Sequence, residues 1–210
     1  YTLWHTLSLH DALPIYIIAS YAARGARIRL DFFTANQERV GTVAKVLAAC
    51  LQNEGKIILC GNGGSAADAQ HLAAEFVSRF QIERRPLPAI ALTTDTSVIT
   101  AIGNDDGFEH VFRKQLQALA RPADVLLALS TSGNSPNIVL ALEQAATIGM
   151  TRIGLAGCDG GLMRDRCEHL LQVDCSETPL IQEVHISLGH LLCALVDHLL
   201  FETGEEHAHF

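Results

Sequence analysis

Positive charge is scarce in this sequence. Of its 210 residues, 15 are Lys or Arg and 23 are Asp or Glu, so the formal net charge is −8. That balance lacks the basic surface that broad binding to nucleic acid or to an anionic membrane requires. We therefore expect no nucleic-acid partner and no membrane partner, while a local pocket for a small anion stays open.

The six cysteines lack a pairing pattern, and long apolar runs are also absent. No CxxC motif occurs, and no uninterrupted apolar run reaches the roughly 18 residues of a membrane span. Hydrophobic residues make up 49% of the chain and charged residues 18%. This composition favours one well-packed domain with reduced, mostly buried thiols. We expect a cytoplasmic protein.

The first residues lack the features of a targeting segment. Residues 1–16, YTLWHTLSLHDALPIY, contain no Lys or Arg and make a weak signal peptide. They fit poorly with the rest, and we expect them to be foreign to the natural protein. Residues 17–55 place apolar residues at helical spacing in two stretches, and we predict an N-terminal helical hairpin ending at Gly55. The hairpin must pack on the domain or on another subunit to bury its apolar face.

Short apolar runs then alternate with helical patterns. The runs are KIILC (56–60), LPAIAL (87–92), DVLLALS (124–130), RIGLAG (152–157) and HLLQVD (169–174). Helical patterns lie near 66–80, 95–120, 135–149, 160–166 and 179–202. Such alternation is typical of βαβ units with helices on both faces of a parallel sheet. We predict an α/β domain over residues 56–202, with a five-stranded, doubly wound parallel sheet of the flavodoxin-like kind, and a tail at 203–210.

Two loops that join a strand to a helix are candidates for binding phosphate, because ligands of such sheets lie beyond the carboxyl ends of the strands. The first reads Gly61-Asn62-Gly63-Gly64-Ser65. Its glycines allow close approach of the backbone to a ligand, and a helix N-terminus offers free N–H groups. A plain tight turn would have the same composition, and GxGxxA also matches a dinucleotide fingerprint.

The second loop, STSGNS, places hydroxyls at Ser130, Thr131, Ser132 and Ser135. Helix capping explains Ser135 alone. A cluster of hydroxyls at a helix start suits a phosphate monoester, and no Walker Lys follows. A dinucleotide enzyme would leave this loop unexplained and would need an acidic residue earlier than Asp95. The two loops together favour a phosphosugar.

His71 and Glu75 are four residues apart on the helix after the first loop, so their side chains are neighbours. The last helix carries a second polar set at Gln182, His185 and His190. Polar groups buried there without partners would each cost about 1–3 kcal/mol. A surface pair would explain His71 and Glu75 alone, whereas a His, a Glu, a Gln and a second His could together fill a zinc-type shell.

Four blocks together resemble the phosphoheptose isomerases of the sugar isomerase (SIS) domain family. They are CGNGGSAADAQHLAAEF, LTTDTSVITAIGNDDGFEHVF, LLALSTSGNSPNIVLAL and IQEVHISLGHLLCALVD. The likeness covers roughly residues 35–202 and keeps the family's order. The resemblance implies interconversion of sedoheptulose 7-phosphate and glycero-manno-heptose 7-phosphate, on the way to the heptose of lipopolysaccharide core. It also implies a homotetramer with one Zn²⁺ per subunit.

The resemblance further implies roles for single residues. Zinc ligands would be His71, Glu75, Gln182 and His190, with Glu75 as the catalytic base and His190 as the acid. Substrate contacts would come from the two loops, from the GNDDGF segment and from two of the zinc ligands: Asn62, Gly63, Gly64, Ser65, Glu75, Asn104, Asp105, Ser130, Thr131, Ser132, Ser135 and Gln182. Arg79 is a weaker candidate for contact with an anion.

Two other functions stay open at the level of sequence. One is that of a non-enzymatic SIS paralogue that binds the replication initiator protein, which lacks the acidic residue at Glu75 and the His at His190. The other is an isomerase for a different phosphosugar. One position departs from the family: Leu180 stands where many relatives carry Arg, which puts in doubt any contact of that Arg.

Overall fold

Five short apolar runs form the predicted parallel sheet. The computed structural model describes residues 9–202 and has strands β1 (Ile57–Cys60), β2 (Ala89–Ala91), β3 (Val125–Ser130), β4 (Thr151–Gly157) and β5 (His169–Val173). All neighbouring strands are parallel, in the order β2-β1-β3-β4-β5. Every residue of β1 and β3 is buried. Burial on both faces explains why these strands are continuously apolar rather than alternating.

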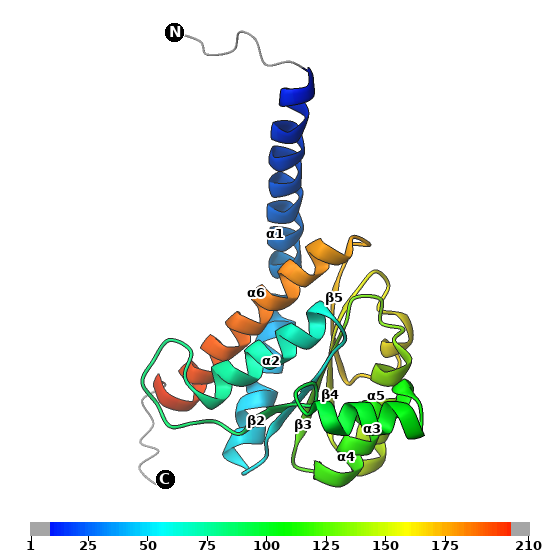
Figure 1. Ribbon diagram of the computed structural model, residues 1–210. Helices are drawn as coiled ribbons and strands as arrows, with labels where there is room; N and C mark the ends of the chain where they lie inside the picture. The colour runs from blue at the N-terminus through cyan, green and yellow to red at the C-terminus, as the bar shows by residue number, and fades with distance from the viewer. Residues whose placement is uncertain (1–8, 203–210) are drawn as a thin grey trace.

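Helices cover both faces of the sheet (Figure 1). After β1 they are α2 (Gly64–Val77), α3 (Thr96–Asp105), η1 (Phe108–His110), α4 (Val111–Leu119), α5 (Pro136–Ile148), η2 (Gly161–Met163), α6 (Thr178–Asp197) and η3 (His198–Glu202). The helix predicted over 95–120 is interrupted after α3, because Gly107 has a φ of 102° that no helix admits; η1 begins after Gly107 and continues directly into α4.

The side chains of each central strand separate into two cores. Ile57 and Leu59 pack in one core with residues of α1, α2 and α6. Ile58 and Cys60 pack in the other with residues of α4 and α5. This alternation follows from the two-residue period of a strand, and it places α2 and α6 on the same face of the sheet.

Two N-terminal helical stretches are present as predicted, but they do not fold back into a hairpin (Figure 1). They form α1 (Leu9–Gln52) and meet at a kink at Asn36, where φ is −119° and ψ is 16°. No Gly or Pro separates the two predicted segments, so the chain continues in one direction instead of turning back. The side chain of Asn36 donates to the carbonyl of Phe32 and closes the kink.

The two halves of α1 have different surroundings. Residues 32–51 pack on the sheet domain, and ahead of them Tyr21 donates to Glu183 of α6 at 2.5 Å while Arg24 pairs with Glu177. The part of α1 that precedes Tyr21 projects from the domain and leaves Leu13, Ile17 and Ile18 more than half exposed (Figure 1). Part of the expected foreign leader, residues 9–16, continues this helix, and its origin stays a prediction. Residues 1–8 and the predicted tail at 203–210 lie outside the described part of the chain.

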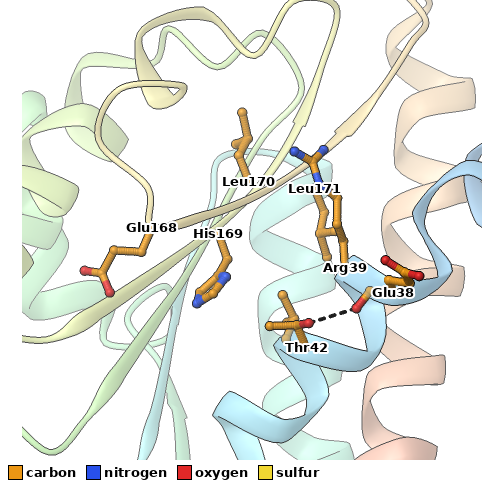
Figure 2. A pocket seen from close by; sticks show the side chains of 8 residues that line it. Glu38, Arg39, Thr42, Glu168, His169, Leu170 and Leu171 are labelled. Atoms are coloured by element: carbon orange, nitrogen blue, oxygen red, sulfur yellow. Dashed lines mark hydrogen bonds between the residues drawn. The ribbon is translucent and has the colours of Figure 1, made fainter.

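Two further features of the fold bear on function. Residues Thr178–Glu202 are apolar and long enough to cross a bilayer, but α6 buries Leu180, Val184, Leu188 and Leu192 inside the domain, as a core helix does. A cavity of about 230 Å³ lies between α1 and the start of β5 (Figure 2). It is at the amino end of that strand, opposite the loops where ligands of such sheets bind.

Candidate active site at the carboxyl ends of the strands

The first loop leaves the N-terminus of α2 without a side-chain cap. Gly63, the N-cap residue, has a φ of 54°, which favours glycine. A side chain at Gly61 would begin 2.4 Å from the carbonyl oxygen of Ser65, so the loop can close only with glycine there. A cavity of about 130 Å³ lies beside Asn62 and Gly63 and is bordered by the exposed ring of Phe108. Uncapped amides beside an open cavity can bind an anion.

The second loop, Ser130–Ser135, places its hydroxyl groups at the N-terminus of α5. Ser135 is the N-cap residue of α5, but its side chain makes no capping bond and instead meets the Ser130 hydroxyl at 3.1 Å. The hydroxyl of Ser132 accepts from the backbone N–H of Asn134, and Thr131 is partly exposed. Because α5 begins with Pro136, which has no N–H, and Ile138 donates to the carbonyl of Ser135, this loop offers a ligand its hydroxyls more than the amides of the helix.

An amide pair joins the two loops. The Asn62 side chain donates to Asn137 Oδ1 and accepts from Asn137 Nδ2, both at 2.8 Å, and Asn137 is 2% exposed. Asn62 was predicted to contact substrate, and its side-chain amide is engaged with α5. Asn137 was missed, because nothing local to α5 indicates that it reaches a loop 75 residues earlier. The pair aligns the starts of α2 and α5.

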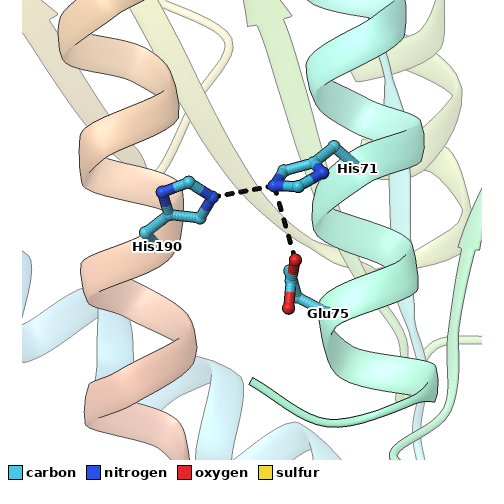
Figure 3. Close-up of side chains that lie close together, drawn as sticks. All are labelled: His71, Glu75 and His190. Carbon is cyan, nitrogen blue, oxygen red and sulfur yellow. Dashed lines mark hydrogen bonds and ion pairs between the residues drawn. The ribbon is translucent and has the colours of Figure 1, made fainter. Parts of the chain in front are cut away.

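Two helices bring a His, a Glu and a second His together (Figure 3). His71 and Glu75 lie on α2, and His190 lies on α6. The Nε2 atoms of the two histidines are 2.8 Å apart, and Glu75 Oε1 lies 3.4 Å from His71 Nε2. One ligand atom from each residue lies within 4.8 Å of the others. The ring of Phe80 stacks on His190 with centroids 5.5 Å apart and fixes the orientation of the imidazole.

Asp68 of α2 lies close enough to His71 and His190 to interact with them electrostatically, and it was not predicted. Its Oδ2 atom is buried and has no hydrogen-bond partner among the described residues. Burial raises the pKa of the Asp68 carboxyl, and the nearby His71 and His190 lower it. The spacing of three residues before His71 could have revealed it, because carboxylates often accept the second ring N–H of a metal-binding His.

The remaining predicted residues lie around this centre. The amide of Gln182 lies against the first loop: a side chain at Gly64 would begin 2.5 Å from Gln182 Nε2. On α6, Gln182 is about 12 Å of helix rise before His190. Asn104 donates to Asp105 at 2.7 Å, and both side chains are exposed at the end of α3. Arg79 pairs with Glu83 at the surface.

His185 does not join the polar set of α6. It is fully buried, and its Nε2–H donates to the carbonyl of Ala156 in β4 at 3.1 Å. Its Nδ1 atom is buried without a partner among the described residues. Burial lowers the pKa of His185 to about 4, so the ring is neutral and serves as a core residue.

The family model of the SIS domain matches residues 20–157. Together with the sheet and its two loops, this match defines an SIS domain protein. A phosphoheptose isomerase of Nitratidesulfovibrio vulgaris (strain Miyazaki F) is 58% identical over 89% of this chain and 90% of its own length. A phosphoheptose isomerase of Burkholderia pseudomallei (strain K96243) is 54% identical over 80% of this chain and 86% of its own. The chain belongs to the phosphoheptose isomerases of the SIS domain family.

Solved structures agree with this assignment. The phosphoheptose isomerase of Neisseria gonorrhoeae is 45% identical, with a TM-score of 0.82 over 87% of this chain and 97% of that one. The enzyme of Francisella tularensis is 38% identical, with a TM-score of 0.85 over 88% of this chain and 98% of that one. The resemblance drawn from the four sequence blocks is thereby confirmed, and the chain is assigned as an isomerase.

Proposed function

We propose that this chain interconverts sedoheptulose 7-phosphate and D-glycero-D-manno-heptose 7-phosphate through an enediol. In the cytoplasm this reaction would supply heptose for lipopolysaccharide precursors. The observation that carries the proposal is the convergence of His71, Glu75 and His190 beside two loops of phosphate-binding character. A carboxylate and an imidazole side by side are the groups that an aldose–ketose isomerisation requires.

The phosphate is proposed to bind at the second loop. Ser130, Thr131, Ser132 and Ser135 supply hydroxyls there, at the N-terminus of α5 with its positive end of the helix dipole. The first loop lies beside it because β1 and β3 are neighbouring strands. Gly63, Gly64 and Ser65 then meet the sugar chain, which extends along α2 toward His71, about 10 Å of helix rise from Gly64. Asn104 and Asp105 are proposed as further substrate contacts.

Two residues are proposed to move the protons. Glu75 removes the proton from C1 of the ketose and returns it to C2, while His190 takes the proton of the C1 hydroxyl and delivers one to the C2 oxygen. The half-buried position of both groups limits the access of water to the enediol. The ring of Phe80 stacks on His190 and keeps the imidazole in one orientation.

One zinc ion per subunit is proposed at the triad. Two imidazole nitrogens and a carboxylate oxygen are the ligand types that zinc prefers, and they converge within 4.8 Å. Bound zinc would polarise the carbonyl of the substrate. Gln182 is proposed as the fourth ligand.

A homotetramer is proposed for the assembly. The part of α1 that precedes Tyr21 projects from the domain and exposes Leu13, Ile17 and Ile18, and Leu30 is exposed farther along the same helix. An apolar helical surface of this length favours contact with other subunits.

The test is isomerisation of sedoheptulose 7-phosphate by the purified chain, free of metal and with added zinc. Glu75→Gln keeps the size of the side chain and removes the base, and we expect turnover to fall at least about 100-fold. Glu38→Gln, a matched change in α1 beside the cavity at the other end of the sheet, should leave turnover unchanged. Absence of turnover from folded protein in both metal states would contradict the heptose substrate and favour another phosphosugar or the initiator-binding role.

A further inference from the structure

A buried ion pair joins the carboxyl ends of the two helices that form the triad. Arg84, in the segment between α2 and β2, donates from Nε to Asp197 Oδ1 at 2.6 Å. The side chains are 1% and 4% exposed. Asp197 is the last residue of α6. The pair therefore ties the chain that follows α2 to the end of α6.

The rest of the Arg84 guanidinium caps α2. Its Nη2 donates to the carbonyl of Glu75 at 2.9 Å, and its Nη1 donates to the carbonyls of Phe76 at 2.9 Å and Ser78 at 3.3 Å. The last carbonyls of a helix have no partner within the helix and carry partial negative charge. Because α2 has no basic residue in its own last turn, Arg84 supplies the positive charge there.

We call Arg84 with its bonds to Asp197 and to the last carbonyls of α2 the clamp. The clamp contacts or adjoins triad residues on both helices. The carbonyl that accepts from Nη2 belongs to Glu75 itself. Asp197 follows His190 by seven residues, which is two helical turns and places both on the same face of α6. One guanidinium thus holds the backbone of one triad residue and the helix of another.

We propose that Arg84 is a positioning residue, which holds α2 and α6 at the separation that lets His71, Glu75 and His190 converge on one zinc ion. The inference rests on the proposed function. Stability alone does not account for the clamp, because apolar residues of similar volume often replace a buried ion pair without loss of stability. A guanidinium differs from an ammonium in that its planar fork can hold several acceptors in fixed directions.

The test uses the full chain and two alterations of the clamp. Arg84→Lys keeps the charge and loses the fork. The double variant Arg84→Met, Asp197→Leu replaces the pair by apolar side chains. For both, we expect the zinc dissociation constant, measured by competition with a chromophoric chelator, to rise about 10-fold or more, as when partners behind metal ligands are removed. Excess zinc should restore turnover. The metal-free double variant should still be folded and unfold cooperatively, at a lower temperature than the unaltered chain because the last carbonyls of α2 lose the guanidinium.

Arg152→Lys is the matched control. Arg152 in β4 pairs at 2.7 Å with Glu168, the residue before β5, and neither residue belongs to α2 or α6, so this change should leave zinc affinity unaltered. Unchanged zinc affinity in the double variant would overturn the clamp while leaving the proposed function intact. If both variants are unfolded without metal, the pair is required for folding, and this outcome would also overturn the proposal that Arg84 is a positioning residue. An unaltered chain that binds no zinc would overturn the metal site and the clamp together.

Discussion

Acidification tests the packing of His185 directly. The ring lies in the core between α6 and β4, with Nε2–H bonded to Ala156 and Nδ1 without a partner among the described residues. Protonation would place a charge on Nδ1 where no acceptor is available. Burial therefore lowers the pKa of His185 from 6.5 to about 4, although the bond to Ala156 opposes the shift.

The shift has a definite effect on stability. The unfolded chain takes up the proton near pH 6.5, whereas the folded chain does so only near pH 4, so the unfolded state binds more protons between these values. The contribution of His185 is fully present above pH 6.5 and is lost as pH falls toward 4. At 1.36 kcal/mol per pH unit, the full loss is about 3 kcal/mol, of which about 2.5 kcal/mol appears between about pH 7.5 and pH 4.5.

His185→Gln removes the titrating group and keeps a donor for Ala156. Urea unfolding of both chains, free of metal and at one protein concentration, should give free energies whose difference falls by about 2.5 kcal/mol on acidification over that interval. The other histidines titrate in both chains and cancel in the difference. Parallel curves of unfolding free energy against pH would refute the burial argument, because they would mean that His185 takes up its proton equally in both states.

Three further substitutions have effects that follow from close contacts. Gly133→Ala would place a Cβ 2.1 Å from a backbone carbonyl oxygen at a φ of +65°; it should cost about 1–3 kcal/mol in thermal unfolding and raise KM for the sugar phosphate, and an unchanged KM would contradict the phosphate role of the second loop. Gly189→Ala would press on Leu72 from 2.4 Å and push α6 from α2, so calorimetric titration should show weaker zinc binding; equal affinity would argue against close helix approach as a condition of the site. Asp124→Ala removes a buried carboxylate that pairs with Lys56 Nζ at 2.5 Å and accepts from the backbone N–H groups of Lys56 and Arg121, so it should cost about 2–3 kcal/mol in urea unfolding while turnover stays constant. A loss of turnover would link this remote pair to the site.

The strands were predictable because their information is local. β3 is continuously apolar, and a run of that kind between helical patterns forms a strand buried on both faces. The relation of His71 to Glu75 was predictable for the same reason, since four residues on a helix make neighbours regardless of what packs outside. The prediction of a hairpin was wrong because the local sequence carries no information on this point: helical spacing on both sides of Asn36 does not indicate whether the chain turns back there.

By itself, then, the sequence determined the five strands, the two loops and the pairing of His71 with Glu75, because periodicity and turn chemistry act over a few residues. Only the tertiary structure placed His190 against His71 across 119 residues, paired Asn62 with Asn137, and buried Arg84 against Asp197. It also separated His185 from the other polar residues of α6 by turning it into the core. A helical pattern specifies which side chains share a face, whereas the packing of helices on the sheet decides what that face meets.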